Sequence, residues 1–158
     1  MLALLNLHFS YHTGQPVFSG FNWSVNAGEM WAILGPSGCG KTTLLYVLAG
    51  LRLPERGEVL INDGRITRPR PQTGLILQDY GLLPWATVRD NVMLGLKLRR
   101  FYGPDGRHAP TNENVRDRLP AVQRWIDRLC LTAVADRFPG QLSGGQRQRT
   151  AIARTLVL

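Results

Sequence analysis

Residues 35–42, with the sequence GPSGCGKT, combine glycines, a lysine and a threonine at the spacing of a phosphate-binding loop. Glycines have no Cβ, so consecutive backbone N–H groups can turn inward and cradle phosphate oxygens. Lys41 can reach the β- and γ-phosphates of a nucleotide, and the hydroxyl of Thr42 can ligate Mg²⁺. The loop therefore predicts a site for a nucleoside triphosphate and Mg²⁺.

The lysine in this loop is unusual for the chain. Lysine and arginine together number 19, and only Lys41 and Lys97 are lysine. A lysine ammonium is a compact point charge on a slim stem, whereas an arginine guanidinium is a planar fork. We therefore expect position 41 to need a slim cation.

Hydrolysis at such a site also needs an acidic residue at the end of a neighbouring buried strand to hold Mg²⁺. Three aspartates follow apolar stretches, namely Asp63, Asp79 and Asp136. Asp63 precedes a glycine and fits a hairpin turn, and the stretch before Asp136 is a weak strand pattern. Asp79 is the best candidate on these general grounds, but the choice among the three stays open.

The elements that must position the loop are predicted from apolar periodicity. Strand patterns occur at residues 2–11, 21–25, 30–34, 57–63 and 74–78. A helix follows the loop and ends at Gly50, and two more helices are predicted over residues 87–100 and 115–131. Thr87 is the expected N-cap of the second helix, and Pro120 marks the start of the third or a kink in it. The pattern predicts an α/β part followed by a helical segment.

The composition fits one globular domain. The chain has 158 residues, of which 44% are hydrophobic, with no apolar run of membrane-spanning length and no signal-peptide pattern at its start. Cys39 and Cys130 offer neither metal-ligand spacing nor a disulfide framework, which fits a reducing cytosol. The formal net charge is +8, but the arginines are scattered and form no basic stripe, so nucleic acid is not an expected partner.

Residues 142–146, LSGGQ, form a second glycine-rich turn at the start of a helix pattern. Ser143 is a suitable N-cap, and Gly144 and Gly145 expose backbone N–H groups that make a second anion-binding surface. Together with the phosphate loop, this turn and the RQRTAIARTL that follows it resemble the signature of ATP-binding cassette (ABC) ATPases. The resemblance covers the whole chain.

The resemblance implies an α/β fold of the P-loop NTPase type, in which an ABC nucleotide-binding domain has a RecA-like core, an antiparallel β part and an inserted α-helical subdomain. It implies an ATP-binding core at residues 1–81, a helical subdomain at 82–141, and a signature turn and helix at 142–158 that return to the core. The family continues beyond ARTLVL with a strand that ends in the Mg²⁺-binding Asp and the catalytic Glu. We therefore expect the last part of the core to be missing from these 158 residues, and the chain as given to be a poor ATPase.

The resemblance also assigns the site residues. The implied ATP-binding residues are Tyr11, which would stack on adenine, and Gly35, Pro36, Ser37, Gly38, Cys39, Gly40, Lys41, Thr42 and Thr43. The implied signature residues, which act on the nucleotide of a partner subunit, are Leu142, Ser143, Gly144, Gly145 and Gln146. Gln78 would contact Mg²⁺ and the attacking water, with Thr42 as the other Mg²⁺ ligand. We expect no complete catalytic set in these residues, because the family's Mg²⁺-binding Asp and catalytic Glu are not among them and His8, His12 and His108 do not match its switch histidine.

The stretch LLPWATVRDNV, residues 82–92, resembles importer ATPases of the nitrate, sulfonate and taurine type. In these, Trp85 would lie on the surface that meets the membrane permease. The implied partners are a second ATP-binding subunit in a head-to-tail dimer, the permease and, indirectly, a substrate-binding protein. The implied location is the cytoplasmic face of the bacterial inner membrane.

Two alternatives remain. A soluble, non-transport ABC ATPase acting on DNA or ribosomes would predict basic insertions, which are not visible here. A phosphate-loop kinase or GTPase outside the ABC family, with Asp79 as its metal ligand, leaves the LSGGQ turn unexplained.

Overall fold

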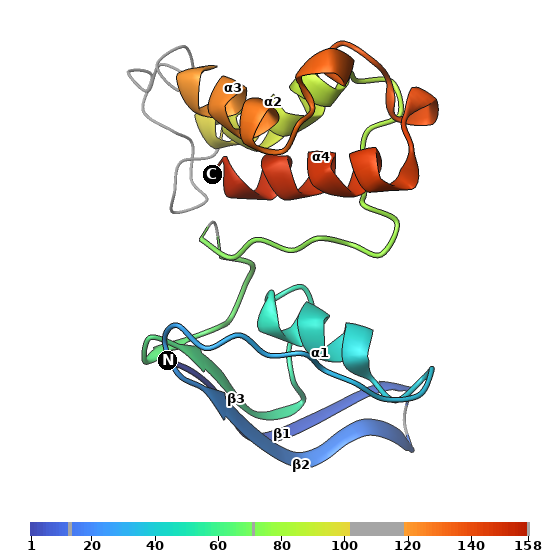
Figure 1. The fold of residues 1–158 in the computed structure, drawn as a ribbon. Helices are drawn as coiled ribbons and strands as arrows, with labels where there is room; N and C mark the ends of the chain where they lie inside the picture. The colour runs from blue at the N-terminus through green and yellow to red at the C-terminus, as the bar shows by residue number, and fades with distance from the viewer. Residues whose placement is uncertain (13, 71, 102–118, 158) are drawn as a thin grey trace. The chain divides into compact units, whose positions relative to one another are not determined.

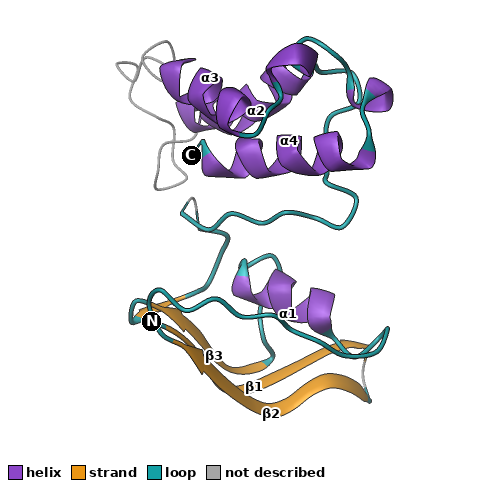
Figure 2. Cartoon of the chain, viewed as in Figure 1, coloured by secondary structure: helices purple, strands orange, loops and turns teal. Residues whose placement is uncertain are grey.

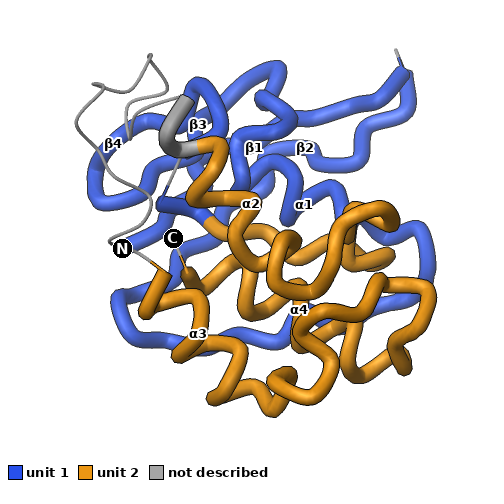
Figure 3. Tube along the Cα trace, turned by 90° about the horizontal axis from the view of Figure 1, so that it is seen from above, with its two compact units in different colours: residues 1–73 blue, residues 74–158 orange. Residues whose placement is uncertain are grey.

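The computed structural model describes residues 1–12, 14–70, 72–101 and 119–157. The chain forms two compact units, Met1–Thr73 and Gly74–Leu158 (Figure 3). The first unit holds the sheet and one helix, and the second holds the other helices (Figure 2). The finer division into residues 1–81, 82–141 and 142–158 stays a prediction.

The first unit is built on a four-stranded antiparallel sheet with the strand order β2-β1-β3-β4 (Figure 1). Its strands are β1 (Leu2–His12), β2 (Gln15–Val25), β3 (Arg56–Ile61) and β4 (Gly64–Arg65). Helix α1 (Lys41–Leu48) covers one face of this sheet and buries Leu44 and Val47 against it. The predicted strands near residues 2–11, 21–25 and 57–63 are thus confirmed.

An irregularity in β1 shapes this core. Leu4 and Leu7 are both fully buried although residues three apart on a regular strand point to opposite faces. The pairing of β1 with β2 shifts register between these two leucines, and Asn6 between them has a positive φ of 49°. Such a bulge re-aims the side chains that follow it, so both leucines reach the core.

The turn between β3 and β4 follows its sequence. Asn62 and Asp63 have φ values of 49° and 60°, as the two central residues of a type I′ hairpin turn require. Ile61 then pairs with Gly64. The turn expected at Asp63 and Gly64 is confirmed.

Two predicted strands, residues 30–34 and 74–78, do not form. Among the described residues, ladder hydrogen bonds join only β1 to β2, β1 to β3 and β3 to β4. Met30 is 96% exposed and Leu34 is 89% exposed, and although the Trp31 ring meets that of Trp23 edge to face, the first segment is not flanked by strands. An apolar run shows that a segment favours burial between strands, but it does not supply the strands that must flank it.

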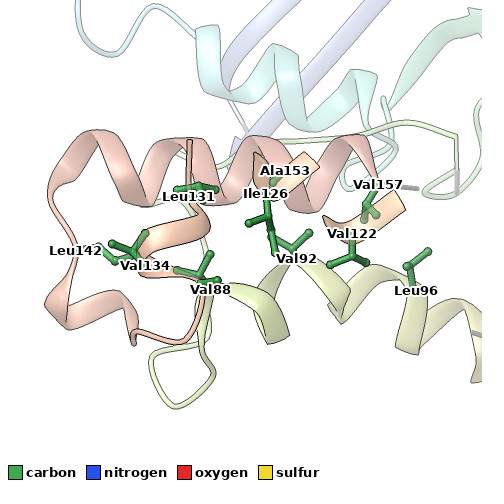
Figure 4. Packing of buried hydrophobic residues seen from close by; sticks show 11 residues of the cluster. Val88, Val92, Leu96, Val122, Ile126, Leu131, Val134, Leu142, Ala153 and Val157 are labelled. Carbon is green, nitrogen blue, oxygen red and sulfur yellow. The ribbon is translucent and has the colours of Figure 1, made fainter. Parts of the chain in front are cut away.

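The second unit is helical and comprises α2 (Val88–Phe101), α3 (Leu119–Arg128) and α4 (Gly144–Leu156). Short 3₁₀ turns lie at Thr132–Val134 and Pro139–Gln141. Its core packs aliphatic side chains from all three helices and their connections (Figure 4). The buried members are Val88, Val92, Leu96, Val122, Ile126, Leu131, Val134, Ala135, Leu142, Ala153 and Val157.

The start of α2 confirms the predicted cap. The backbone N–H of Asp90 donates to Oγ1 of Thr87 at 3.1 Å, and this hydroxyl donates to Oδ2 of Asp90 at 2.8 Å. The described part of helix α3 runs from Leu119 to Arg128 and includes Pro120, so whether the proline starts or kinks this helix stays a prediction. The expected helical residues 115–118 and His108 lie outside the described residues. No helix in the described ranges is both long enough and apolar enough to cross a membrane.

Candidate nucleotide-binding site

The phosphate loop leads directly into α1, as the sequence predicts. Gly38 and Gly40 have φ values of 83° and 95°, in the left-handed region that glycine adopts without strain. A Cβ on Gly40 would lie 2.8 Å from Cγ1 of Val17 and 3.3 Å from Cζ of Phe18. Both the backbone conformation and the packing against β2 therefore require glycine at position 40.

The N-terminus of α1 is open to an anion. Its N-cap residue, Gly40, has no side chain to satisfy the first backbone N–H groups, and no acidic residue lies in the first turn. The unsatisfied N–H groups and the helix dipole together favour a negatively charged ligand at this point. Because α1 has eight residues, this end is a full helix terminus rather than an isolated turn. The loop and the helix start fit the phosphates of ATP.

Lys41 lies across the loop that precedes it. Its Nζ donates to the carbonyl oxygens of Gly35 at 2.8 Å and Pro36 at 2.6 Å, and lies 3.6 Å from Sγ of Cys39. The same Sγ would be 2.8 Å from a Cβ on Gly35, so Cys39 fills the space that this glycine leaves. The ammonium is thus held within the loop, where it can exchange carbonyl oxygens for phosphate oxygens.

The residues after Lys41 divide into an exposed and a buried threonine. The side chain of Thr42 is more exposed than that of Thr43, which is only 7% exposed. Oγ1 of Thr43 lies 3.2 Å from the hydroxyl of Tyr11, at hydrogen-bond distance. The structure therefore brings together Tyr11 and the start of α1, two parts of the predicted site that are 32 residues apart. Ser37 is also exposed, at the outer turn of the loop.

Tyr11 is an accessible aromatic residue near the end of β1. Its side chain is 48% exposed, and its ring meets that of Phe9 edge to face with centroids 5.0 Å apart. This exposure is higher than a core aromatic residue would have and leaves ring surface on which a base can stack. Its role in stacking stays a prediction.

Gln78, in the second unit, begins a tight turn. The backbone N–H of Tyr80 donates to the Leu77 carbonyl at 3.0 Å, and that of Gly81 donates to Oδ1 of Asp79 at 3.2 Å. Asp79 is therefore a turn residue that caps its own loop. This use of its carboxylate does not favour the alternative in which Asp79 holds the metal.

Arg154 on α4 holds the same turn from the other side. Its guanidinium donates to the carbonyl oxygens of Gly81 and Tyr80 at 2.6 and 2.7 Å. Burial lowers the pKa of Arg154, and the nearby carboxylate of Asp79 partly offsets this; the group remains charged. The helix that begins with the LSGGQ turn is thus joined to the turn that carries Gln78.

The LSGGQ turn starts α4 as predicted. The hydroxyl of Ser143 accepts the Gln146 N–H at 3.3 Å, and Oε1 of Gln146 accepts the Ser143 N–H at 2.9 Å. This reciprocal pair is a capping box. Leu142 is buried in the helical core and anchors the turn from behind. These contacts explain Ser143 and Gln146 as a helix cap, and by themselves they indicate no further function.

Two adjacent glycines in this turn are not explained by packing. Among the residues that the structure describes, a Cβ on Gly144 would meet nothing within 4 Å, and one on Gly145 would meet only a side-chain atom of Arg149 at 3.8 Å. Neither has a positive φ, in contrast to Gly40. The fold of this chain therefore does not require glycine at either position.

Trp85 projects from the segment before α2 and is 73% exposed. The fully buried Asn91 fixes this segment, since its Nδ2 donates to the carbonyl oxygens of Leu83 at 3.1 Å and Ala86 at 3.0 Å. The backbone N–H of Leu83 donates in return to Oδ1 of Asn91 at 2.8 Å. The structure thus presents an aromatic side chain on a held loop.

The metal chemistry of the site depends on few protein ligands. The described parts of the chain contain no group of three or more His, Cys, Asp or Glu side chains that could hold a metal ion. Mg²⁺ is commonly bound by one or two protein oxygens together with substrate phosphates and water. The Thr42 hydroxyl, in the first unit, and the Gln78 amide oxygen, in the second, are oxygens of this kind, and their shared role as Mg²⁺ ligands stays a prediction.

Two residues with clear contacts were not found from the sequence. Arg154 contacts the turn after Gln78, and the guanidinium carbon of Arg52 lies 5.9 Å from the centroid of the Tyr11 ring. Both are among 17 arginines, and no motif distinguishes them. Arginine is well suited to contacts with carbonyl groups and aromatic rings, but this suitability does not identify a particular arginine before its partner is known.

Comparison with known proteins identifies the family. Residues 18–158 match the ABC transporter family. The chain is 38% identical over 156 residues to the taurine import ATP-binding protein TauB of Escherichia coli O157:H7, covering 99% of this chain and 56% of that protein. It is 36% identical over 151 residues to the aliphatic sulfonates import ATP-binding protein SsuB of Bacillus cereus, covering 95% and 54%. The chain thus spans about half the length of these curated relatives.

Solved structures show the same fold. A dimeric post-hydrolysis state of an ATP-binding cassette bound to ADP and Pi superimposes with a TM-score of 0.77 at 31% sequence identity. The match covers 99% of this chain and 69% of that one. A dimeric bacterial ABC transporter cassette gives the same TM-score at 32% identity. The predicted fold class, a mixed α/β fold of the ABC ATPase type with an antiparallel sheet, is confirmed.

Proposed function

The chain belongs to the ABC transporter family, and we propose that it is the ATP-binding subunit of an importer for a small oxyanion such as taurine, another sulfonate or nitrate. In this role it would bind ATP and pass the energy of binding and hydrolysis to a membrane permease. The single observation that carries the nucleotide part is Lys41, which lies across a glycine loop at the open N-terminus of α1. The relatives named above support the import part.

ATP with Mg²⁺ would supply the cleavable phosphate bond and the electrostatic stabilisation of its charge. The loop N–H groups and the start of α1 would hold the phosphates, and Lys41 would neutralise charge on the β- and γ-phosphates. Thr42 and Gln78 would each offer one oxygen to Mg²⁺. Tyr11 would bind the adenine base through its exposed ring.

The LSGGQ turn would act on the nucleotide of a second subunit in a head-to-tail dimer. Gly144 and Gly145 support this role, because no contact among the described residues explains why these positions lack a side chain. A phosphate approaching the start of α4 from outside needs close access to backbone N–H groups, which a Cβ would obstruct. ATP-driven closure of two such subunits around two nucleotides, and reopening on hydrolysis, would drive the transport cycle.

Trp85 would contact the permease from the cytoplasmic face of the membrane. An exposed tryptophan on a fixed loop is typical of a surface that a partner covers. The transported compound would be selected by the permease and by a separate substrate-binding protein.

The proposal is tested in the native host by replacing the gene with a Lys41→Ala or Trp85→Ala version and measuring uptake of labelled taurine, an alkanesulfonate and nitrate. Both variants are expected to lose uptake of one of these compounds. The tagged wild-type chain should then copurify with a multispanning membrane protein, and Trp85→Ala should weaken this association while Lys41→Ala retains it. Unchanged uptake with copurification of ribosomes or DNA would instead support a soluble, non-transport ABC ATPase.

A further inference from the structure

Tyr11 is held from three directions within the first unit. Its hydroxyl lies at hydrogen-bond distance from Thr43 on α1, and its ring contacts the ring of Phe9 on the same strand. The guanidinium carbon of Arg52 lies over the ring, 5.9 Å from its centroid. This distance is within the range in which a cation is attracted to the negative face of an aromatic ring.

The loop that carries Arg52 is fixed to the end of β1. The backbone N–H of Arg52 donates to the Tyr46 carbonyl at 3.2 Å, which ties the residue to the last turn of α1. Farther along, the backbone N–H of Glu55 donates to the His8 carbonyl at 2.9 Å, and Oε1 of Glu55 accepts the Ser10 N–H at 3.1 Å. The position of Arg52 beside Tyr11 therefore follows from backbone contacts on both sides.

We infer that Arg52 is a positioning residue of the nucleobase site, which holds the Tyr11 ring from one face so that a purine base stacks on its remaining surface. This inference rests on the proposed function, in which Tyr11 binds the base. A cation on one face of the ring draws electron density away from the other face, which favours stacking of an electron-rich purine there. It also restricts the Tyr11 side chain before the ligand arrives, which lowers the entropy cost of binding.

Arg52 is expected to act on the base and not on the phosphates. The phosphate loop, residues 35–42, ends on the first two residues of α1, whereas Arg52 follows the last turn of α1. The Arg52 guanidinium carbon lies over the Tyr11 ring, whereas the Lys41 ammonium donates to the loop carbonyl oxygens of Gly35 and Pro36. The contribution of Arg52 should therefore depend on Tyr11 and be absent for a ligand without a base.

The experiment compares ATP, ADP and inorganic tripolyphosphate by isothermal titration calorimetry with the full 158-residue chain. Arg52→Ala should weaken ATP and ADP binding by the same factor, about two- to fivefold, and leave tripolyphosphate binding unchanged. Arg52→Lys, which keeps a cation but not the planar group, should recover part of the loss. The matched control is Arg65→Ala, which removes the same charge far from Tyr11. Arg65 on β4 pairs with Leu60 on β3, and Leu60 pairs with Ala3 at the start of β1, whereas Tyr11 is near the end of β1.

The dependence on Tyr11 is tested by adding Arg52→Ala to Tyr11→Leu, and no further loss of ATP affinity is expected. Weaker tripolyphosphate binding in Arg52→Ala, or an undiminished loss in the Tyr11→Leu background, would overturn the inference by showing a direct phosphate contact. If Tyr11→Leu weakens ATP but Arg52→Ala does not, the inference alone fails. If Tyr11→Leu leaves ATP binding unchanged, both the inference and the adenine-binding role of Tyr11 are wrong. Unchanged ATP binding in Lys41→Ala would contradict the proposed nucleotide site as a whole.

Far-UV circular dichroism of each variant checks that it is folded. If Arg52→Ala does not fold, Arg52→Lys is measured in its place.

Discussion

The guanidinium of Arg154 donates to the carbonyl oxygen of Gly81 at 2.6 Å, and so joins α4 to the turn after Gln78 across 73 residues of sequence. A second donation from Arg154 reaches the Tyr80 carbonyl. Tyr80 and Gly81 both have positive φ, with values of 66° and 56°. A tyrosine in this conformation is strained, and the two hydrogen bonds from Arg154 help to hold it.

Replacing Arg154 with methionine should therefore loosen this turn. Methionine keeps much of the aliphatic stem but leaves two half-buried carbonyl oxygens without a charged donor. The expected loss in free energy of unfolding is about 2–3 kcal/mol. Arg154→Lys has a single ammonium group, so its free energy of unfolding should lie between those of the wild type and the methionine variant. Hydrogen exchange at residues 79–83 should accelerate in the methionine variant, whereas unchanged exchange there would show that the contact contributes little.

Lys41→Ala should weaken ATP binding tenfold or more, because a charge-assisted contact to the phosphates contributes about 1.5–3 kcal/mol. Titration of the purified chain with ATP measures this effect. The control is Lys97→Ala, which removes the other lysine of the chain from an exposed pair with Asp90. Equal ATP affinity in the Lys41→Ala and wild-type chains would contradict the site assignment.

Replacing the glycines of the LSGGQ turn with alanine should leave the stability of the fold intact while impairing the proposed function of the turn. Gly144→Ala and Gly145→Ala place a Cβ in open space, so the free energy of unfolding should stay constant or rise by up to about 1 kcal/mol. Gly40→Ala is the contrasting control, since its φ is 95° and Val17 lies in the way, and it should destabilise the first unit by about 1–3 kcal/mol. Urea unfolding measures both effects.

The same two alanine variants should reduce ATP-dependent association of two chains, measured by sedimentation velocity with and without ATP. A large loss of stability in either variant, with association intact, would show that these glycines serve the fold after all.

The pair of Asp90 and Lys97 on α2 gives a dependence on pH. The hydrogen bond from Lys97, and then the one from Thr87, lower the pKa of Asp90 below its usual value. The charged carboxylate therefore stabilises the folded state above the unfolded pKa, and this stabilisation is lost as the pH falls through the lower, folded pKa.

Asp90→Asn should accordingly reduce the free energy of unfolding at neutral pH, and the difference from wild type should shrink at acidic pH. Because both side chains are about half exposed, the loss at neutral pH should be less than about 1 kcal/mol. Asp136→Asn is the control, since its partner Arg89 is 3.7 Å away and Asp136 is 89% exposed. A difference between Asp90→Asn and wild type that does not change with pH would contradict this account.

The features that the sequence predicted correctly are those set by neighbouring residues. Thr87 and Ser143 cap the helices that follow them, and Asp63 lies in the expected turn, because each acts within three or four residues of itself. The contacts of Arg52 and Arg154 with distant partners could not be predicted, since an arginine carries no sign of which surface it meets. The strand predicted at residues 30–34 was wrong for a related reason, because strand formation depends on neighbours that the segment itself does not encode.

That segment also determines how the purified chain should behave in solution. Residues 30–34, MWAIL, contain no charge and no proline, and their exposed apolar side chains could pair with the same segment of a second molecule. We expect concentration-dependent aggregation, measured by light scattering and thioflavin T fluorescence, and slower aggregation in Leu34→Lys, which places a charge at a side chain that is 89% exposed. The shelf life of the protein at high concentration should thus be set by a short segment that contributes nothing to either core.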